Sequence, residues 1–443
     1  MYGGSPLNRL SWLRPNHAFA NALLASSASK WIVFKAGEPL VVRSADKQSL
    51  ALLTTSDVRP LLGPEPYFGQ GQEPGQSLSP EHLLPTTEAA RHHGIPIVFL
   101  GLHELSLRTC EVSSEDAKNA DAAVAGLEGT PYFSIDIGDS ELSPDELGKV
   151  LQETSLGKEG LTLDWTEPRS MMSGLDVFTA AVFAVARSLT DWNFRNKFCP
   201  ACGSRSYSLW SGWKLSCSSL LPWTDNTGRK PCPTVKGLHN FMHPRTDAVV
   251  IMIAIDETGD KILLGRGKRF PGKFYSALAG FIEPGESFED AVARETWEEA
   301  GVKVWDTRYH STQPWPYPAN LMAGFYSRAD ASQPIRTDLD NELVDAKWFT
   351  RDEVLSVLTH SGGGFGRAEY KKIAESFEGR DNLADPNAKT QPTSLKAAEI
   401  RPDAAEPPFR VPPATAIAGV LIRDWVEGKI KFPKEEITQK GNL

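Results

Sequence analysis

Short apolar runs separated by turn-forming residues dominate the first third of the chain. Runs of this length, rich in Val, Ile, Leu and Phe, are typical of strands, and a longer apolar run at 175–196 predicts a helix. A Pro-, Gly- and Gln-rich stretch at 63–85 predicts a long loop. The predicted strands are 31–34, 40–42, 95–100 and 132–137. Residues 1–184 are therefore expected to form an N-terminal domain of mixed α/β structure.

The second half of the chain continues this mixture of strand and helix patterns. Residues 248–255 and 261–264 predict two strands joined by a turn, and 415–427 has the apolar spacing of an amphipathic helix. Residues 361–408 are polar, rich in Gly and Pro, and without period, which predicts a disordered insertion. The whole pattern indicates an α+β protein in three parts: 1–184, a cysteine-containing segment at 195–235, and a C-terminal domain at 244–435.

A further helix, predicted within 280–302, has an acidic face. Its carboxylates Glu295, Glu298 and Glu299 are spaced i, i+3 and i+4, which places all three on one side. Like charges this close repel one another unless a cation neutralises them, and Mg²⁺ or Mn²⁺ favours oxygen ligands. The alternative is an ordinary solvated acidic face. We further expect Glu286, on the preceding loop, to add to the site and Arg294, beside the cluster, to hold a glutamate in place. The buried stripe of the helix is expected to be Phe288, Ala291, Val292 and Ala300.

Composition limits the possible partners. The chain has 47 basic and 56 acidic residues, a formal charge of −9, so a general nucleic-acid coat, which requires a basic excess, is excluded. No apolar stretch reaches the roughly 18 residues of a membrane span, and we expect no membrane contact.

Four of the five cysteines lie close together in the sequence. Cys199 and Cys202 form a CxxC pair, followed by Cys217 and Cys232 at equal intervals, whereas Cys110 is isolated. Four thiolates suit a closed, structural Zn²⁺ site. The alternative is a set of unrelated buried thiols.

Prolines and aromatic residues alternate at 313–320. Prolines stiffen the backbone, so Trp315 and Tyr317 would be held rigidly enough to stack on a planar base. The alternative is a rigid connecting loop with core aromatics. The candidate substrate-binding residues of this segment are Gln313, Pro314, Trp315, Pro316, Tyr317, Pro318, Ala319 and Asn320.

The acidic segment resembles the Nudix box, whose fixed positions are matched by Gly280, Glu286, Arg294, Glu295, Glu298, Glu299, Gly301 and Val302, with Thr296 at a position that prefers an aliphatic residue. The resemblance implies a Nudix fold, with a mixed sheet between helices. It implies hydrolysis of a nucleoside diphosphate derivative, with Glu295, Glu299 and the Ala279 carbonyl as ligands of Mg²⁺ or Mn²⁺. Glu298 is then the remaining ligand or the catalytic base.

The aromatic segment is similar to the SQPWPFPxS signature of the NADH pyrophosphatase branch, with Thr312, Tyr317 and Asn320 as departures. The branch carries a zinc ribbon before the Nudix domain and forms homodimers. The same resemblance implies a further metal ligand, Glu342, and substrate contacts at His243 and Ala418. The usual second CxxC is replaced here by a long insertion between Cys217 and Cys232.

The expected function is hydrolysis of NAD(H) to NMN(H) and AMP, by water activated on the metal ions. One alternative is removal of the NAD cap from RNA 5′ ends. Another, of a different class, is a zinc-ribbon scaffold with an inactive Nudix domain. Peroxisome and cytoplasm are equally expected locations: the resemblance favours a peroxisomal address, whereas Gly441-Asn442-Leu443 only partly matches such a signal.

Overall fold

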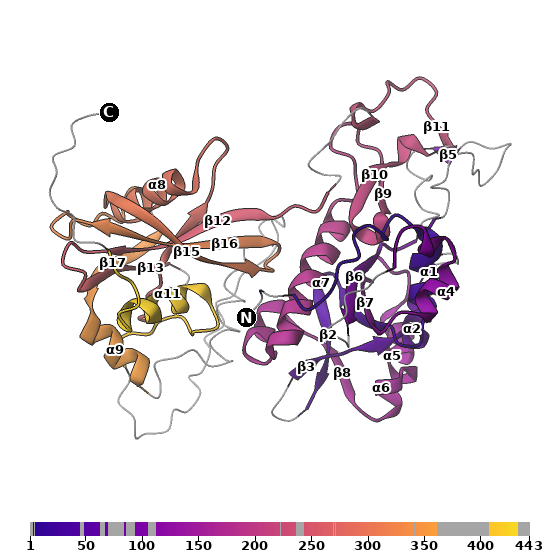
Figure 1. Cartoon of the computed structure of the whole chain (residues 1–443), viewed down its shortest axis with the longest axis horizontal. Helices are drawn as coiled ribbons and strands as arrows, with labels where there is room; N and C mark the ends of the chain where they lie inside the picture. Colours follow the sequence, from indigo (N-terminus) through magenta and orange to yellow (C-terminus); the bar gives the residue numbers. More distant parts are fainter. Residues whose placement is uncertain are drawn as a thin grey trace. The chain divides into compact units, whose positions relative to one another are not determined.

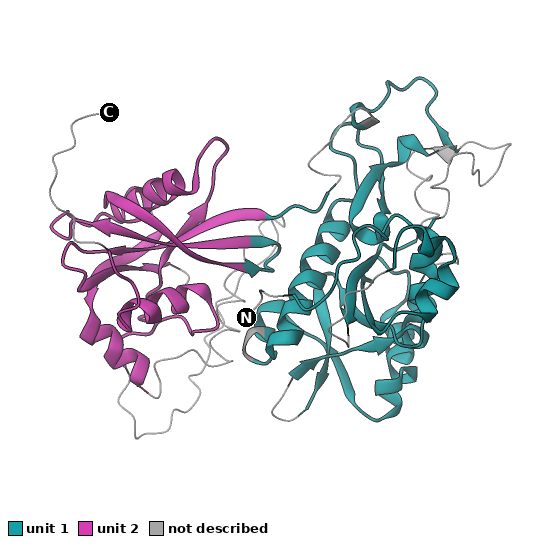
Figure 2. Cartoon of the chain, in the orientation of Figure 1, with its two compact units in different colours: residues 1–246, 314–320 teal, residues 247–313, 321–443 magenta. Residues whose placement is uncertain are grey.

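The computed structural model describes residues 3, 5–44, 48–62, 67–69, 84–85, 94–104, 112–221, 223–235, 243–268, 270, 272–340, 342–360 and 407–432. The chain divides into two compact units (Figure 2): unit 1 comprises residues 1–246 and 314–320, and unit 2 comprises 247–313 and 321–443. The predicted N-terminal domain and the cysteine segment both lie in unit 1, and almost all of the predicted C-terminal domain lies in unit 2.

Unit 1 is built on a mixed sheet with the strand order β3-β2-β1-β7-β6, in which β4 also pairs with β1 and β8 with β2. The central pair, β1 and β7, is parallel, and the other pairings are antiparallel. The strands are β1 (Lys30–Lys35), β2 (Glu38–Arg43), β3 (Gln48–Leu50), β4 (Leu53–Thr54), β6 (Ile97–Glu104), β7 (Gly129–Asp136) and β8 (Thr162–Trp165).

Both faces of this sheet are covered. Because side chains alternate along a strand, Trp31 and Val33 of β1 join one core cluster with Phe19 and Leu23 of α1. On the opposite face, Phe34 contacts Phe183 of α7, with ring centroids 6.2 Å apart. The helices of unit 1 are α1 (His17–Ala25), α2 (Thr55–Val58), α4 (Ala120–Ala125), α5 (Pro144–Glu153), α6 (Ser155–Lys158) and α7 (Val177–Arg195).

The cysteine segment follows α7 and is built around a short antiparallel hairpin, β9 (Ser206–Leu209) and β10 (Lys214–Cys217) (Figure 1). The tip of this hairpin is the 3₁₀ turn η5 (Trp210–Gly212). A second short pairing joins β11 (Thr224–Asp225) to β5 (Leu84–Pro85) in parallel.

Unit 2 contains a sheet with the order β15-β16-β12-β13-β17, and β14 pairs with β12. Figure 1 shows α8 on one side of this sheet and α9 and α11 on the other. The elements are β12 (Asp247–Ile255), β13 (Lys261–Gly267), β14 (Leu278–Phe281), α8 (Phe288–Ala300), β15 (Val304–Trp315), β16 (Asn320–Ala329), β17 (Leu343–Thr350), α9 (Arg351–Thr359) and α11 (Ile417–Val426).

The central strand β12 explains this layering. Its continuous apolar run is typical of a strand buried on both faces. Val250 and Met252 pack with Ala291 and Val292 of α8, whereas Ile251 packs in the cluster formed by α9 and α11. The α+β class and the mixed sheet between helices are therefore confirmed.

The predicted strands and helices are confirmed, with ends shifted by a few residues. One detail was wrong: Phe288 is 41% exposed, because it is the first residue of α8 and lies at the edge of the buried stripe. The predicted insertion 361–408, except for its last two residues, lies outside the described residues, as do Cys110, most of 63–85 and the C-terminal tripeptide. Among the described helices, none is long and apolar enough to cross a bilayer.

Candidate active site and metal centres

Helix α8 begins and ends where its sequence dictates. The Ser287 hydroxyl accepts a hydrogen bond from the Asp290 amide, and the Asp290 carboxylate accepts one from the Ser287 amide, which forms a capping box. The helix ends at Gly301, whose φ of 68° lies in the left-handed region that glycine tolerates best. Thr296 is fully buried and its hydroxyl donates to the Val292 carbonyl at 2.7 Å, which explains how a threonine replaces the usual aliphatic residue.

Arg294 was expected to hold a glutamate in place, and it holds three: Glu286 of the preceding loop, and Glu295 and Glu298 of the acidic face. Its Nε and Nη2 donate to Glu286 at 2.5 and 2.9 Å, and its Nη1 donates to Glu295 at 2.8 Å and Glu298 at 2.9 Å. The Arg294 guanidinium, with the Glu283 amide, lowers the pKa of Glu286 to about 2. Glu286 is therefore ionised at neutral pH and fixes Arg294 in place.

The remaining glutamate of the face, Glu299, has no such partner. It is 4% exposed, none of the ion pairs among the described residues includes it, and its carboxylate accepts one hydrogen bond, from the Ala279 amide at 3.2 Å. Burial, aided by the nearby charge of Glu295, raises the pKa of Glu299 well above its usual range. Burial also raises the pKa of Glu295, against the opposing effect of Arg294. Both effects indicate a cluster with too little positive charge around it.

Two further carboxylates from the segment before β17 belong to the same electrostatic cluster. Glu342 raises the pKa of both Glu295 and Glu299, and Asp340 raises that of Glu299. The predicted ligand Glu342 therefore interacts electrostatically with Glu295 and Glu299, although it is 43 residues beyond Glu299 in the sequence. Asp340 was not predicted; its position two residues before Glu342 was the available signal. Carboxylate oxygens in excess over positive charge fit a divalent cation.

Gly280 leaves the space that Glu295 occupies. A Cβ built on Gly280 would lie 1.8 Å from the Cδ of Glu295, so no larger residue fits without moving that carboxylate. We predict that Gly280→Ala displaces Glu295 and lowers kcat about 100-fold, since misplacing a group by about 1 Å has effects of this size. Steady-state hydrolysis rates measure this change. Gly148→Ala on α5, where a Cβ would meet nothing within 4 Å, is the control, and equal rates for both variants would contradict the prediction.

The four cysteines converge. The Sγ atoms of Cys199, Cys202, Cys217 and Cys232 all lie within 4.8 Å of one another. Two of the separations are 3.7 Å, between Cys199 and Cys232, and 3.4 Å, between Cys202 and Cys217. A tetrahedral ion with metal–sulfur bonds of about 2.3 Å requires sulfur atoms about 3.8 Å apart. The thiols therefore fit a closed tetrahedral centre, with Cys232 included despite its distance in sequence.

The aromatic segment forms the turn between β15 and β16. Trp315 and Tyr317 contact each other edge to face at 5.3 Å. The Tyr317 hydroxyl donates to the Pro168 carbonyl at 3.5 Å, and the Arg169 guanidinium lies 5.3 Å from its ring centroid. Tyr317 is 8% exposed, whereas Trp315 is half-buried. Trp315 thus has more free surface for a ligand than Tyr317 has.

The other predicted substrate residues have varied surroundings. Both polar atoms of the Gln313 amide are bonded to the backbone of Thr415 and Ile417, at 2.9 and 2.8 Å, which fixes the start of α11. Ala418, in the first turn of α11, is buried in the core.

The remaining predicted substrate residues lie elsewhere. The ring centroids of His243 and Trp210 are 5.8 Å apart. Pro316 is buried, and Pro314, Pro318, Ala319 and Asn320 are half-buried at the turn. Their contacts with a substrate remain predictions.

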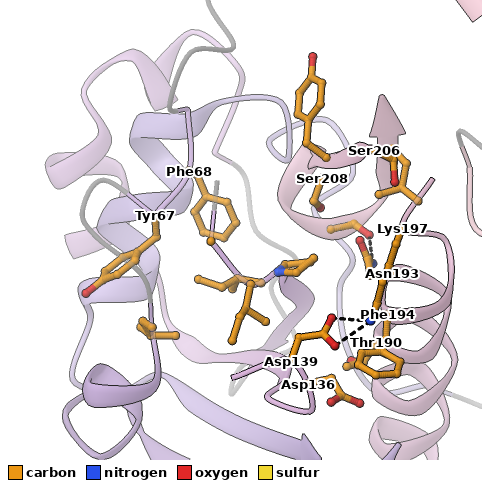
Figure 3. Close-up of a pocket in the computed structure, with 18 of the residues that line it drawn as sticks. Tyr67, Phe68, Asp136, Asp139, Thr190, Asn193, Phe194, Lys197, Ser206 and Ser208 are labelled. Atoms are coloured by element: carbon orange, nitrogen blue, oxygen red, sulfur yellow. Dashed lines mark hydrogen bonds and ion pairs between the residues drawn. The ribbon is translucent and has the colours of Figure 1, made fainter. Parts of the chain in front are cut away.

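A cavity of about 690 Å³ lies in unit 1 and includes none of the predicted site residues. In Figure 3, Tyr67 and Phe68 lie on one side of it, and Thr190, Asn193 and Phe194 of α7 lie on the other. Lys197 and Asp139 close part of the wall as an ion pair at 2.6 Å. Because it lacks the acidic cluster and the aromatic turn, we do not assign the hydrolytic chemistry to this cavity.

Comparison with known proteins places these features in a family. The model of the NUDIX domain matches residues 244–365. An NAD-capped RNA hydrolase of Schizosaccharomyces pombe is 34% identical over 357 residues, which are 81% of this chain and 85% of that protein. The Saccharomyces cerevisiae NAD-capped RNA hydrolase NPY1 is 30% identical over 385 residues, 84% of this chain and 89% of its own. The human NAD-capped RNA hydrolase NUDT12 is 48% identical over 180 residues, 41% of this chain and 36% of its own.

The Schizosaccharomyces pombe and Saccharomyces cerevisiae proteins align with 81% and 84% of this chain, well beyond residues 244–365 that the NUDIX domain model matches. The acidic α8 face, the aromatic turn and the four converging cysteines occur together in this chain. This chain therefore belongs to the Nudix hydrolase family, in the NADH pyrophosphatase subfamily that includes these relatives.

Proposed function

We propose that this protein hydrolyses the diphosphate bond of NAD(H), giving NMN(H) and AMP. The observation that carries the proposal is the α8 carboxylate cluster, in which Arg294 holds Glu286, Glu295 and Glu298 while Glu299 is buried beside the Ala279 backbone. Relatives aligned over most of their length and named NAD-capped RNA hydrolases support it.

The proposed roles in the reaction are metal binding and proton transfer, and different carboxylates carry them. Glu295, Glu299, Glu342 and the Ala279 carbonyl are the proposed ligands of Mg²⁺ or Mn²⁺, which would neutralise the diphosphate oxygens and make water more acidic. Glu298, 44% exposed and bonded to Arg294, is the carboxylate available to accept a proton from the attacking water. The water oxygen bonds to one phosphorus, and the bridging oxygen leaves with the other phosphate.

The cysteine centre is proposed to hold one Zn²⁺. Four thiolates with no free coordination position make a structural rather than a catalytic site. Its ligands Cys199, Cys217 and Cys232 are buried, and Cys202 is half-buried. The ion would therefore stabilise the hairpin that carries Trp210.

The NAD cap of an RNA 5′ end is a second candidate substrate, favoured by the names of the relatives. It contains the same diphosphate bond, so the same carboxylates would cut it. An inactive scaffold is disfavoured, because all the box carboxylates are retained and are held by Arg294.

Product analysis by mass spectrometry tests the proposal. NADH, ADP-ribose, a diadenosine polyphosphate and NAD-capped RNA are offered side by side with Mg²⁺ or Mn²⁺. We expect NMNH and AMP from NADH, and NMN with 5′-monophosphate RNA from the capped RNA. Cleavage of neither dinucleotide substrate, with either metal, would refute the proposed activity.

We predict that the aromatic turn sets substrate choice rather than chemistry. Trp315→Ala should lower kcat/KM for NADH about 10- to 100-fold, since stacking on one ring contributes about 1–3 kcal/mol. It should have little effect on ADP-ribose, which lacks the nicotinamide ring. Trp305→Ala, which removes a 38% exposed tryptophan from the same strand, is the matched control. Equal losses on both substrates would make the turn merely structural.

Dimerisation and location rest on the family resemblance alone. We propose a homodimer, which sedimentation equilibrium tests. We also propose the peroxisome as one of two locations, the other being the cytoplasm. Imaging an N-terminal fluorescent fusion with and without Gly441-Asn442-Leu443 decides this: a diffuse signal with the tail intact excludes a C-terminal peroxisomal address.

A further inference from the structure

The hairpin tip of the cysteine segment has an unusual backbone. Trp210 and Ser211 both adopt left-handed conformations, with φ of 51° and 52°, which non-glycine residues rarely do. The next residue, Gly212, has a φ of 93° and packs so tightly that a Cβ there would lie 2.7 Å from the Cα of Val98. Strained residues of this kind cluster at functional sites. The backbone of the tip is therefore of the kind found at functional sites.

Three cations surround the two tryptophans of this tip. The Arg14 guanidinium lies 3.6 Å from the Trp213 ring centroid and that of Arg9 lies 5.1 Å from it. The Lys214 ammonium lies 4.5 Å from the Trp210 ring. We call Arg9, Arg14, Trp210, Trp213 and Lys214 the Arg–Trp cluster. All five belong to unit 1.

No acidic side chain in the described part of the chain neutralises the cations of this cluster. Among the described residues, none forms an ion pair with Arg9, Arg14 or Lys214. Burial lowers the pKa of Arg9, and burial together with the neighbouring charge of Arg9 lowers the pKa of Arg14 to about 10. Partly buried cations normally have an anionic partner. In a chain with a net charge of −9, two adjacent arginines that have no anionic partner among the described residues point to an anion supplied from outside.

Trp210 provides the second kind of contact. It is 36% exposed, and its other ring neighbour is His243, at 5.8 Å, a predicted substrate residue. Exposed aromatic rings beside cations are the usual platform for unpaired bases. The Arg–Trp cluster thus combines sites for phosphate and for a base next to a residue expected to contact the dinucleotide.

We propose that the Arg–Trp cluster binds the single-stranded RNA that follows an NAD cap, with Arg9 and Arg14 on its phosphates and Trp210 under one of its bases. This inference rests on the proposed function, since it assigns the RNA part of that substrate. It predicts that capped RNA and free NADH, although cut by the same carboxylates, depend differently on these residues.

The direct test is binding of a fluorescent, uncapped 5′-monophosphate RNA of about 12 nucleotides to the full chain, by anisotropy. Arg9→Gln/Arg14→Gln should raise Kd at least tenfold. It should also lessen the slope of log Kd against log salt by about 1.4, because each lost single-strand phosphate contact removes about 0.7. The matched control is Lys149→Gln/Lys158→Gln, which removes two exposed cations from α5 and α6. An unchanged Kd in the arginine variant overturns the proposal.

Two further variants guard against misfolding. Lys214→Ala and Trp210→Ala leave the Arg9–Trp213–Arg14 packing in place, and each should raise Kd about three- to tenfold. If neither does, the proposal fails whatever the arginine variant shows. Competition separates the possible anions: displacement of the RNA by inorganic phosphate at equal phosphate concentration, by poly-glutamate, or by duplex RNA as effectively as by single strands would each overturn it.

Turnover separates this inference from the proposed function. Arg9→Gln/Arg14→Gln should lower kcat/KM for NAD-capped RNA about tenfold and leave kcat/KM for NADH within twofold. Equal losses on both substrates contradict the RNA assignment. If the parent protein cuts neither substrate, the proposed function fails, and the binding of uncapped RNA still decides the inference.

Discussion

Replacing Glu299 with Gln is expected to abolish hydrolysis while leaving the fold intact. Glu299 is the most buried carboxylate of the cluster, and of the acidic-face residues Glu295, Glu298 and Glu299 it is the one that Arg294 does not hold. Its charge is therefore available to a cation. An amide is a poor ligand for Mg²⁺, and losing about 4 kcal/mol of transition-state stabilisation lowers the rate about 1,000-fold. Steady-state turnover of NADH, with Mg²⁺ and with Mn²⁺, measures the loss.

The same substitution should not unfold the helix. Glutamine has the shape of glutamate, and its carbonyl oxygen can still accept the hydrogen bond from the Ala279 amide. It also removes a buried charge, whose burial opposes folding. The melting temperature of the variant should match or exceed that of the parent. Glu289→Gln, an exposed glutamate on the same helix, should keep full activity. Turnover of Glu299→Gln within tenfold of the parent would refute the assignment of Glu299.

Removing one cysteine of the centre should have the largest effect on stability. Cys217 is fully buried, and Cys217→Ser is expected to leave the protein without zinc. Structural zinc sites contribute about 10–16 kcal/mol of apparent binding energy, comparable with the whole stability of a domain. We expect zinc content to fall from one ion per chain to near zero, and the unfolding transition of unit 1 to drop by at least about 10 °C. Metal analysis after dialysis, with calorimetry, measures both.

The control for this prediction is Cys110→Ser, which removes the cysteine that is not one of the four proposed ligands. This variant should keep one zinc bound. Chelation of the parent should reproduce the loss of stability seen in Cys217→Ser. A dialysed parent protein that is folded and active without zinc would end the hypothesis of a structural ion.

Helices and strands with a strongly periodic or continuous apolar pattern were predictable, because that pattern depends only on neighbouring residues. The strands β1, β2, β6 and β7 and the helix α7 follow from runs of apolar residues. The short helices α1, α4 and α5 were missed, since segments of six to ten residues have a weak period and take their stability from packing on the sheet. The burial of Phe288 was predicted wrongly for a related reason. The apolar spacing shows which face of the helix a residue occupies, but the exposure of a residue at the helix end depends on which other elements pack there.

The acidic face of α8 was predictable from the sequence alone. Glu295, Glu298 and Glu299 are brought together by helix geometry within five residues, so their proximity and their mutual repulsion were fixed before any tertiary contact. Arg294 precedes Glu295 directly, so its contact with a glutamate was expected from the sequence, and in the structure it holds Glu295 and Glu298.

Tertiary structure decided everything that joins distant segments. Packing between elements makes Glu299 more buried than Glu295 and Glu298, and brings Asp340 and Glu342 into its electrostatic surroundings. It also brings Cys232 to the other three cysteines. The meeting of Arg9 and Arg14 with Trp213, some 200 residues later in the sequence, is of the same kind. No local pattern encodes these contacts, because helix and strand periods fix only which side of one element a residue occupies. Which other element faces that side is set by how the apolar faces of the whole unit are buried together.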